Sequence, residues 1–517
     1  MSKLKGPFIL FLVITLLVIA GYYGKEILFN QQIADTSDAS GSTTTFRWAG
    51  DGYLGYSFLE TLEMKKQLAR NEMALKFTDD GGDYKSRLEK FADKEYDFIV
   101  LPVNSYLEHG GEHKYPGVIV AAIAESKGAD AIVGFDDVLP SNKINELNNS
   151  DLRIYYTPAS PSSFLLDLTI TDFALDELSN DQAWRREVNG SEEVFAMAEK
   201  AVKDRSKGDA FVMWEPEVSK AINELGLKKL WGSDQFSGYI IDVFVFRREV
   251  VSKSPEKIKA FLKTYFRVLN YYNSRDEEMV KEFSRITGLK KNVVSGMIEN
   301  IDWYNLNENC TQMFDIPLEL GFPSRDGMIN SIYACSDIMI QTGRMQEDIE
   351  DPYQLINTNF LEDLNNSNIK SIGENGNSDD QQFGSLTPSQ WENLQEIGTM
   401  RVEPITFQSG TSHLDYQGEE IVDKVANMLV NNYPEYRIAI RGHTGRGDQK
   451  ANMTLSQKRA EVVRQRLIAV HGIDENRMNP QGLGASSPPK KKSGENSRAY
   501  RLRWARVEFA LLSDDNI

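Results

Sequence analysis

Residues 437–467 read RIAIRGHTGRGDQKANMTLSQKRAEVVRQRL and contain the strongest structural pattern in the chain. Residues 437–441 read Arg-Ile-Ala-Ile-Arg, an alternating pattern that places the large apolar side chains Ile438 and Ile440 on one face, as in a strand. The strand runs into a glycine-containing loop, and a helix follows the loop. The stretch therefore predicts a strand, a loop and a helix in succession.

The segments on either side extend this pattern. Ile421, Val425 and Leu429 mark an earlier amphipathic helix, which should end near Pro434. Before it, a helical segment over 391–396 and a strand over 402–407 are expected. Beyond residue 467, the alternating sequence RWARVEFALL predicts a last strand. Residues 387–513 are therefore predicted to form a βαβαβ domain with a further strand.

This region resembles the OmpA-like peptidoglycan-binding domain, over about residues 401–511. The resemblance rests on Gly442-His443-Thr444, Asn452, Leu455-Ser456, Arg459-Ala460, Gly482, Gly484 and Arg506-Val507-Glu508-Phe509. In that family an Asp directly after Gly-His-Thr and the Arg of Leu-Ser-x-x-Arg-Ala grip the diaminopimelate unit of the wall peptide. The pairing suits a ligand that carries both ammonium and carboxylate groups.

The resemblance implies that Arg459 takes this role here, but the family Asp is replaced by Gly445. Asp448 is the only acid in the loop, and it either substitutes for that Asp or is simply solvated. Arg506 either holds the loop or touches the ligand. The candidate peptidoglycan contacts are Thr444, Asp448, Asn452, Arg459 and Arg506.

Residues 45–364 alternate short apolar runs with amphipathic helices, which is the pattern of an open α/β sheet. Strands are expected over 46–49, 97–103, 118–125, 131–135, 152–156, 210–214 and 239–246. The block resembles periplasmic solute-binding proteins, and within them the nitrate/sulfonate/taurine type. The resemblance is carried by KFADKEYDFIVLP, GADAIVGF, GDAFVMWEP and SPEKIKAFLKTYFRVLNYY. It implies two α/β lobes that close on a small polar or anionic solute.

Ligands of open α/β sheets sit at the carboxyl ends of strands, often against helix amino termini. The Ser162 and Ser163 side chains at a helix start could bind an anionic group, or could only cap the helix. Asp51 or Glu215 could accept from an amine, and Glu215 could instead bond to the interlobe hinge. The candidate solute contacts are Asp51, Tyr53, Asn104, Ser162, Ser163 and Glu215.

The amino terminus has an apolar run. Lys3 and Lys5 precede residues 7–23, whose 17 residues include no ionisable group apart from two tyrosines. We predict a cytoplasmic tip and one transmembrane helix over 1–25, with a cleaved signal peptide as the alternative. Polar linkers are expected over 26–44 and 365–386.

Composition narrows the function further. The 517-residue chain carries a formal charge of −18, which argues against nucleic acid as a partner. Two cysteines exclude a disulfide scaffold and a four-cysteine zinc site, but leave open whether Cys310 and Cys335 pair. No nucleotide or cofactor motif is found, so neither a cofactor nor enzymatic activity is expected.

The sequence thus predicts a single-pass inner-membrane receptor whose bulk lies in the periplasm. It would bind a solute and attach to peptidoglycan, for uptake with a permease or for sensing with a signalling complex. One alternative is a structural or stator-like wall anchor with degenerate lobes. A second is an enzyme built on the bilobal fold.

Overall fold

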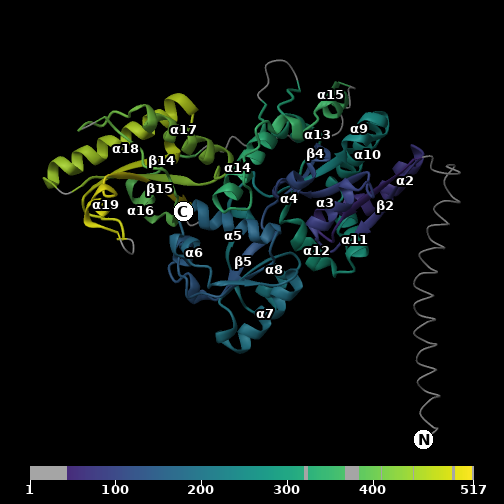
Figure 1. The fold of residues 1–517 in the computed structure, drawn as a ribbon, viewed down its shortest axis with the longest axis horizontal. Coiled ribbons are helices and arrows are strands. Elements are labelled where there is room, and N and C mark those ends of the chain that lie inside the picture. The colour runs from purple at the N-terminus through teal and green to yellow at the C-terminus, as the bar shows by residue number, and fades with distance from the viewer. Residues whose placement is uncertain are drawn as a thin grey trace, which may run out of the picture.

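The computed structural model of the protein describes residues 44–318, 324–366, 383–408, 410–445, 447–491 and 495–514. The predicted anchor at 1–25 lies outside the described residues, as do most of the predicted linkers at 26–44 and 365–386. Within the described ranges, no helix combines the length and apolarity that a bilayer crossing needs. Three sheets organise these residues (Figure 1).

The first lobe is built on a six-stranded sheet with the order β11-β4-β10-β3-β1-β2. β1 is parallel to β2 and β3, whereas β10 runs antiparallel to β3 and β4. β3 and β4 are buried along their whole length, because helices and connections cover both faces. Its elements are β1 (Thr44–Gly50), α2 (Leu62–Arg70), β2 (Met73–Asp79), α3 (Tyr84–Ala92), β3 (Phe98–Pro102), α4 (Val103–Gly110), β4 (Gly117–Ser126), β10 (Ile241–Arg247), α9 (Arg248–Lys253), α10 (Pro255–Asn273), α11 (Asp276–Thr287), α12 (Lys291–Ile298) and β11 (Ile301–Trp303).

The second lobe contains a five-stranded sheet with the order β7-β6-β8-β5-β9. β6 pairs in parallel with β7 and β8, and β5 pairs antiparallel with β8 and β9. Its elements are β5 (Asp130–Gly134), β6 (Ile154–Tyr156), α5 (Pro161–Asp172), α6 (Asp176–Asn180), β7 (Arg185–Glu187), α7 (Ser191–Lys203), β8 (Ala210–Trp214), α8 (Glu217–Asn223) and β9 (Lys228–Gly232).

The chain passes into the second lobe after β4 and returns to the first lobe at β10. Hydrogen bonds tie the two connections together, since the Ser126 hydroxyl lies 2.7 Å from that of Ser233 and 2.8 Å from the Asp130 carboxylate. The helices that follow β11 are α13 (Leu306–Glu308), α14 (Gly327–Gln341) and α15 (Asn359–Asn366). Just after α14, Arg344 bonds to Asp167 of α5 and to Glu108 of α4, so it bridges the lobes.

The third sheet belongs to the carboxyl-terminal domain and has the order β12-β15-β13-β14. The chain order β12, α17, β13, α18, β14 and β15 agrees with the predicted βαβαβ domain and further strand. Its elements are α16 (Pro388–Asn393), β12 (Gln395–Thr399), α17 (Tyr416–Asn431), β13 (Arg437–His443), α18 (Gln449–His471), β14 (Met478–Gly484), α19 (Ser497–Leu502) and β15 (Arg506–Ser513).

The first strand of this domain is displaced from its expected place. The prediction of a strand over 402–407 was wrong, because Phe407 makes only an isolated bridge to Leu414 and the paired strand is β12. Pro404 lacks the amide that a strand pairing needs. The predicted helical segment over 391–396 was also too long, since α16 ends at Asn393.

The carboxyl-terminal domain packs directly against the second lobe, next to α5 (Figure 1). The buried Tyr433 hydroxyl donates to Asp172, at the end of α5, over 2.5 Å. The Asn145 side chain exchanges two hydrogen bonds with the backbone of Thr399. Asn432 bonds through its side chain and backbone to Ser237. The two parts therefore share a specific, partly buried contact.

Candidate functional site

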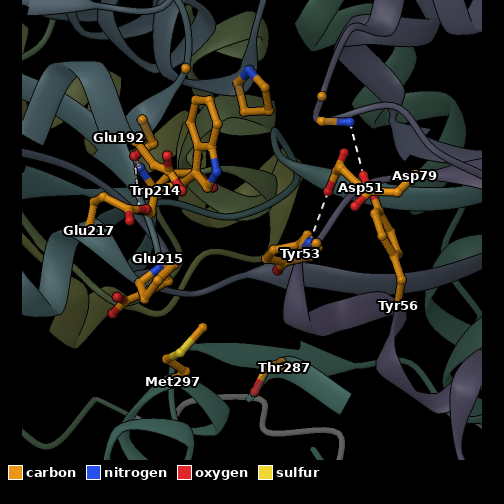
Figure 2. Close-up of a pocket in the computed structure, with 18 of the residues that line it drawn as sticks. Asp51, Tyr53, Tyr56, Asp79, Glu192, Trp214, Glu215, Glu217, Thr287 and Met297 are labelled. Atoms are coloured by element: carbon orange, nitrogen blue, oxygen red, sulfur yellow. Dashed lines mark hydrogen bonds between the residues drawn. The ribbon is translucent and has the colours of Figure 1, made fainter. Parts of the chain in front are cut away.

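A cavity of about 880 Å³ lies between the two lobes. Figure 2 shows Asp51, Tyr53 and Tyr56 on one side, and Trp214, Glu215 and Glu217 facing them from the other. Nine carboxylate side chains line it, whereas Lys220 is the only basic residue among the described lining residues. The nine are Asp51, Glu60, Asp79, Asp130, Glu192, Glu193, Glu215, Glu217 and Asp242.

Asp51 follows β1, at the carboxyl end of a parallel strand, and is held from two directions. Its carboxylate accepts from the Tyr53 amide at 2.9 Å and pairs with the Arg87 guanidinium at 2.9 Å. Arg87 is fully buried and also grips Asp80, so its charge is shared between two acids. The arrangement fixes the Asp51 carboxylate at the edge of the cavity, with Arg87 buried behind it.

Two tyrosines and Asp242 complete the first-lobe wall. Asp242 lies in β10, is 2% exposed, and accepts a hydrogen bond from the Tyr56 hydroxyl. Burial raises the pKa of Asp242 well above its usual range, against the effect of that bond, and the Asp51 and Asp130 charges add to the shift. The Tyr53 hydroxyl is shielded from solvent and has no hydrogen-bond partner among the described residues.

Asp130 and Glu215 form the second-lobe side, because Asp130 opens β5 opposite the last residue of β8, and Glu215 follows that strand. Burial raises the pKa of Asp130 to about 7, and the Glu215 and Asp51 charges contribute. Glu215 accepts from the Ser219 hydroxyl at 2.7 Å and from the Asn300 amide at 3.1 Å. Because Asn300 immediately precedes β11, Glu215 both lines the cavity and bridges the lobes.

The structure brings some of the predicted solute contacts together and leaves others behind the wall. Asp51, Tyr53 and Glu215 line the cavity, whereas Asn104, Ser162 and Ser163 are not among its lining residues. The Ser163 hydroxyl is used in the cap of α5, where it donates to the Ser160 carbonyl. Polar atoms of Asn104 and Ser162 are buried without partners in the described part of the chain.

Sequence reasoning missed Asp130, Asp242 and Tyr56 as lining residues. Asp242 interrupts an otherwise apolar run, which was a usable signal, because a lone acid in a buried strand needs a partner or a function. Asp130 and Tyr56 carried no such signal. Their position depends on how the two lobes face each other.

In the carboxyl-terminal domain, Arg459 lies on α18 and is half-buried. Its Nε donates to the Thr411 carbonyl at 3.2 Å, and its guanidinium lies 4.6 Å from the centre of the Phe407 ring. No carboxylate of the described residues pairs with it, and burial lowers its pKa. Arg459 is therefore a positioned cation whose charge is not compensated within the described chain.

Two other predicted wall contacts, Asp448 and Asn452, have internal roles, whereas the Thr444 hydroxyl has none within the described chain. Asp448 caps α18 by accepting from the Ala451 amide at 2.8 Å. The Asn452 amide donates to the Gly445 carbonyl at 3.0 Å and so shapes the loop. The Thr444 hydroxyl is buried without a partner among the described residues.

Arg506 pairs with Glu508 at 2.6 Å, and Glu508 also bonds to His443. Burial alone would raise the pKa of Glu508, but His443 and Arg506 bring it to about 2. Arg506 thus holds this end of the sheet through Glu508.

The described residues offer no metal site, since no three His, Cys, Asp or Glu side chains gather closely enough to hold an ion. Cys310 and Cys335 are both free and buried, and burial raises the pKa of each thiol to about 12. They are inert, structural cysteines.

The described chain thus consists of two α/β lobes around a cleft, followed by a βαβαβ domain. Residues 406–501, in the carboxyl-terminal domain, match the OmpA family. The OmpA-like resemblance expected from the sequence over about residues 401–511 is thereby confirmed.

Among the curated relatives, two are similar to this chain over about a fifth of its length. The probable lipoprotein YiaD of Escherichia coli (strain K12) is 34% identical over 108 residues, which cover 21% of this chain and 47% of the relative. The outer membrane protein Omp38 of Acinetobacter baumannii is 30% identical over 100 residues, covering 19% and 28% respectively. The chain thus spans less than half the length of these relatives.

Solved structures resemble the lobes at low sequence identity. The aliphatic sulphonate-binding protein SsuA of Escherichia coli is 14% identical with a TM-score of 0.48, covering 62% of this chain and 99% of that one. The alkanesulfonate-binding protein SsuA of Xanthomonas axonopodis pv. citri gives 12% and 0.45, covering 60% and 96%. The nitrate-binding protein NrtA of Synechocystis PCC 6803 gives 12% and 0.46, covering 65% and 92%.

Proposed function

We propose that the protein is an envelope receptor that binds a small polar solute between its lobes and attaches to peptidoglycan through its OmpA domain. The single observation that carries the receptor role is the 880 Å³ interlobe cavity, a volume typical of small-molecule sites, lined by aromatic and polar side chains from both lobes. The wall role is supported by the family match over residues 406–501.

Arg459 is the residue that we assign to the wall peptide. Its planar guanidinium suits bidentate pairing with a carboxylate of diaminopimelate, and no acid of the described chain competes for it. Asp448 keeps an exposed carboxylate while it caps α18, so it can still meet the ammonium group that the missing Asp would have bound. Thr444, Asn452 and Arg506 are the other candidate wall contacts; Asn452 shapes the loop, and Arg506 holds the end of the sheet through Glu508.

A sedimentation assay with purified sacculi tests this assignment. Arg459→Ala should reduce retention at least about tenfold, because a desolvated charge pair contributes about 2 kcal/mol or more. The control is Lys458→Ala, since Lys458 is the exposed neighbour on α18 and its removal changes the net charge equally. Equal retention of the wild type and Arg459→Ala would contradict the site.

The receptor would be held in the inner membrane by residues 1–25, with residues 45–513 in the periplasm. The apolar run and its flanking lysines support this placement. Reporter fusions after Lys25 should be active only outside the cytoplasm, and cytoplasmic activity would contradict the topology. Capture could serve a permease or a signalling complex.

A structural or stator-like wall anchor is the second candidate. The buried contact between Tyr433 and Asp172 favours it, because a wall-binding domain fixed to one lobe suits a load-bearing role. A failure of every small solute to stabilise the purified chain would favour this candidate over a receptor. The third reading, an enzyme, requires turnover by the purified protein.

A further inference from the structure

The cleft is lined by more carboxyl groups than the chain's own cations can pair. Lys220 pairs with Glu217 at 3.1 Å, and Arg87 is shared between Asp51 and Asp80 behind the wall. These pairs leave the positive groups nearest the cavity already occupied. Whatever enters the cleft therefore meets several carboxyl groups that no cation of the described chain pairs.

Three of these carboxylates are both buried and without a cation. Asp130, Glu215 and Asp242 are 4%, 4% and 2% exposed, and none forms an ion pair among the described residues. Their hydrogen bonds come from uncharged groups, namely serine, asparagine and tyrosine side chains and a serine amide. Buried carboxylates are costly unless a positive charge accompanies them.

A second feature points to a ligand in the same place. Burial raises the pKa of the Tyr53 hydroxyl well above its usual range, and the nearby charges of Asp242, Asp130 and Asp51 add to the shift. It is shielded from solvent and lacks a partner in the described part of the chain. A buried hydroxyl among acids from both lobes is a hydrogen-bonding position that the protein leaves unfilled.

The geometry favours an organic occupant over a bare metal ion. Among the described residues, no three of these acids come close enough to share one ion. The cavity of about 880 Å³ is also far larger than an ion requires. Carboxylates spread over both lobes, with Tyr56 beside those of the first lobe and Trp214 beside those of the second, instead suit an organic cation that spans the cleft (Figure 2).

We propose that the cleft binds a small organic cation with one or more ammonium groups, held between Asp242 of the first lobe and Asp130 and Glu215 of the second. The inference rests on the proposed receptor function and names the charge of its solute. The cap of α5 does not offer an alternative anion site, since it is satisfied internally by Ser160 and Ser163.

Calorimetric titration of the full chain with charge-inverted probes tests the inference. The cations are 1,4-diaminobutane and choline, and the anions are succinate, which matches the diamine in length, and ethanesulfonate. We expect the cations to bind and the anions not to bind. Binding of anions alone would overturn the cationic class and leave the receptor function standing, whereas binding of no probe would overturn both.

Variants of the buried acids test which carboxylates hold the cation. Asp130→Asn and Glu215→Gln should each weaken binding of the cation at least about tenfold, since each removes a buried charge partner. Glu199→Gln, an exposed acid on α7 outside the cavity, should leave it unchanged. Circular dichroism and thermal unfolding check that each variant is folded. The assignment would be overturned if the folded Asp130→Asn and Glu215→Gln variants each bound the cation as tightly as the wild type.

Discussion

Asp172 is a buried acid at the contact between the second lobe and the OmpA domain. Burial raises its pKa to about 7, although hydrogen bonds from Tyr433 and Tyr239 oppose the shift. The ordinary pKa of an unfolded Asp is about 3.9, so the folded state holds this proton more tightly. Its contribution to stability is therefore complete below about pH 4 and is lost as the pH rises through about 7.

Asp172→Asn should flatten this dependence, because asparagine has no proton to lose. Between pH 4 and 7, the slope of the unfolding free energy should change by up to about 1.4 kcal/mol per pH unit. Denaturant unfolding at several pH values measures it. Asp130, whose pKa is also about 7, should retain its share of the slope in this variant. An unchanged slope would show that Asp172 does not carry the proton.

At the residue scale, the sequence predicted the cleft only in part. Asp51 and Glu215 were found because each directly follows a strand, and strand ends gather at one edge of a sheet. Asp130 lies at the start of β5 and faces the cleft only because that strand is antiparallel to β8. Ser162 and Ser163 were expected at the cleft because they begin a helix, but the helix uses Ser163 for its own cap.

At the element scale, β12 shows where sequence patterns fail. Its sequence is weak for a strand, and it forms because β15 pairs with one edge and the second lobe covers it. Gly398 permits this contact, since an added Cβ would lie 2.7 Å from a methyl carbon of Ile144 and 2.9 Å from the Asn145 side chain. The longer helices and inner strands were predictable because their own periodicity decides them.

Gly398→Ala should therefore weaken the contact between β12 and the second lobe. We expect a loss of about 1–3 kcal/mol in unfolding free energy, the usual cost of overpacking. Gly296→Ala is the matched control, because nothing lies within 4 Å of its added Cβ and alanine favours the helix α12. Thermal unfolding of both variants measures the difference, and equal stability would mean that β12 can shift freely.

At the scale of the whole molecule, the second lobe and the OmpA domain should unfold together. Their contact includes the Tyr433–Asp172 hydrogen bond, the paired bonds of Asn145 with Thr399, and those of Asn432 with Ser237. A shared buried contact couples the stability of two units. The domain is then not an independent module on a tether.

Tyr433→Phe tests this coupling by leaving the packing in place and removing one buried hydroxyl. It should cost about 1–3 kcal/mol, because Asp172 loses its nearer donor. Differential scanning calorimetry should show one transition for these two units in the wild type and a separated or broadened one in the variant. Two separate transitions in the wild type would contradict the coupling.

The contact at α5 also decides which lobe of the proposed receptor would stay still. A wall-bound OmpA domain would immobilise the second lobe with it, since the two share a buried boundary at Asp172. Closure over a solute would then swing the first lobe, whose β1 begins at Thr44, directly after the residues that lead from the proposed anchor. Relative to the wall, binding of a solute would therefore displace the amino-terminal side of the chain at the membrane.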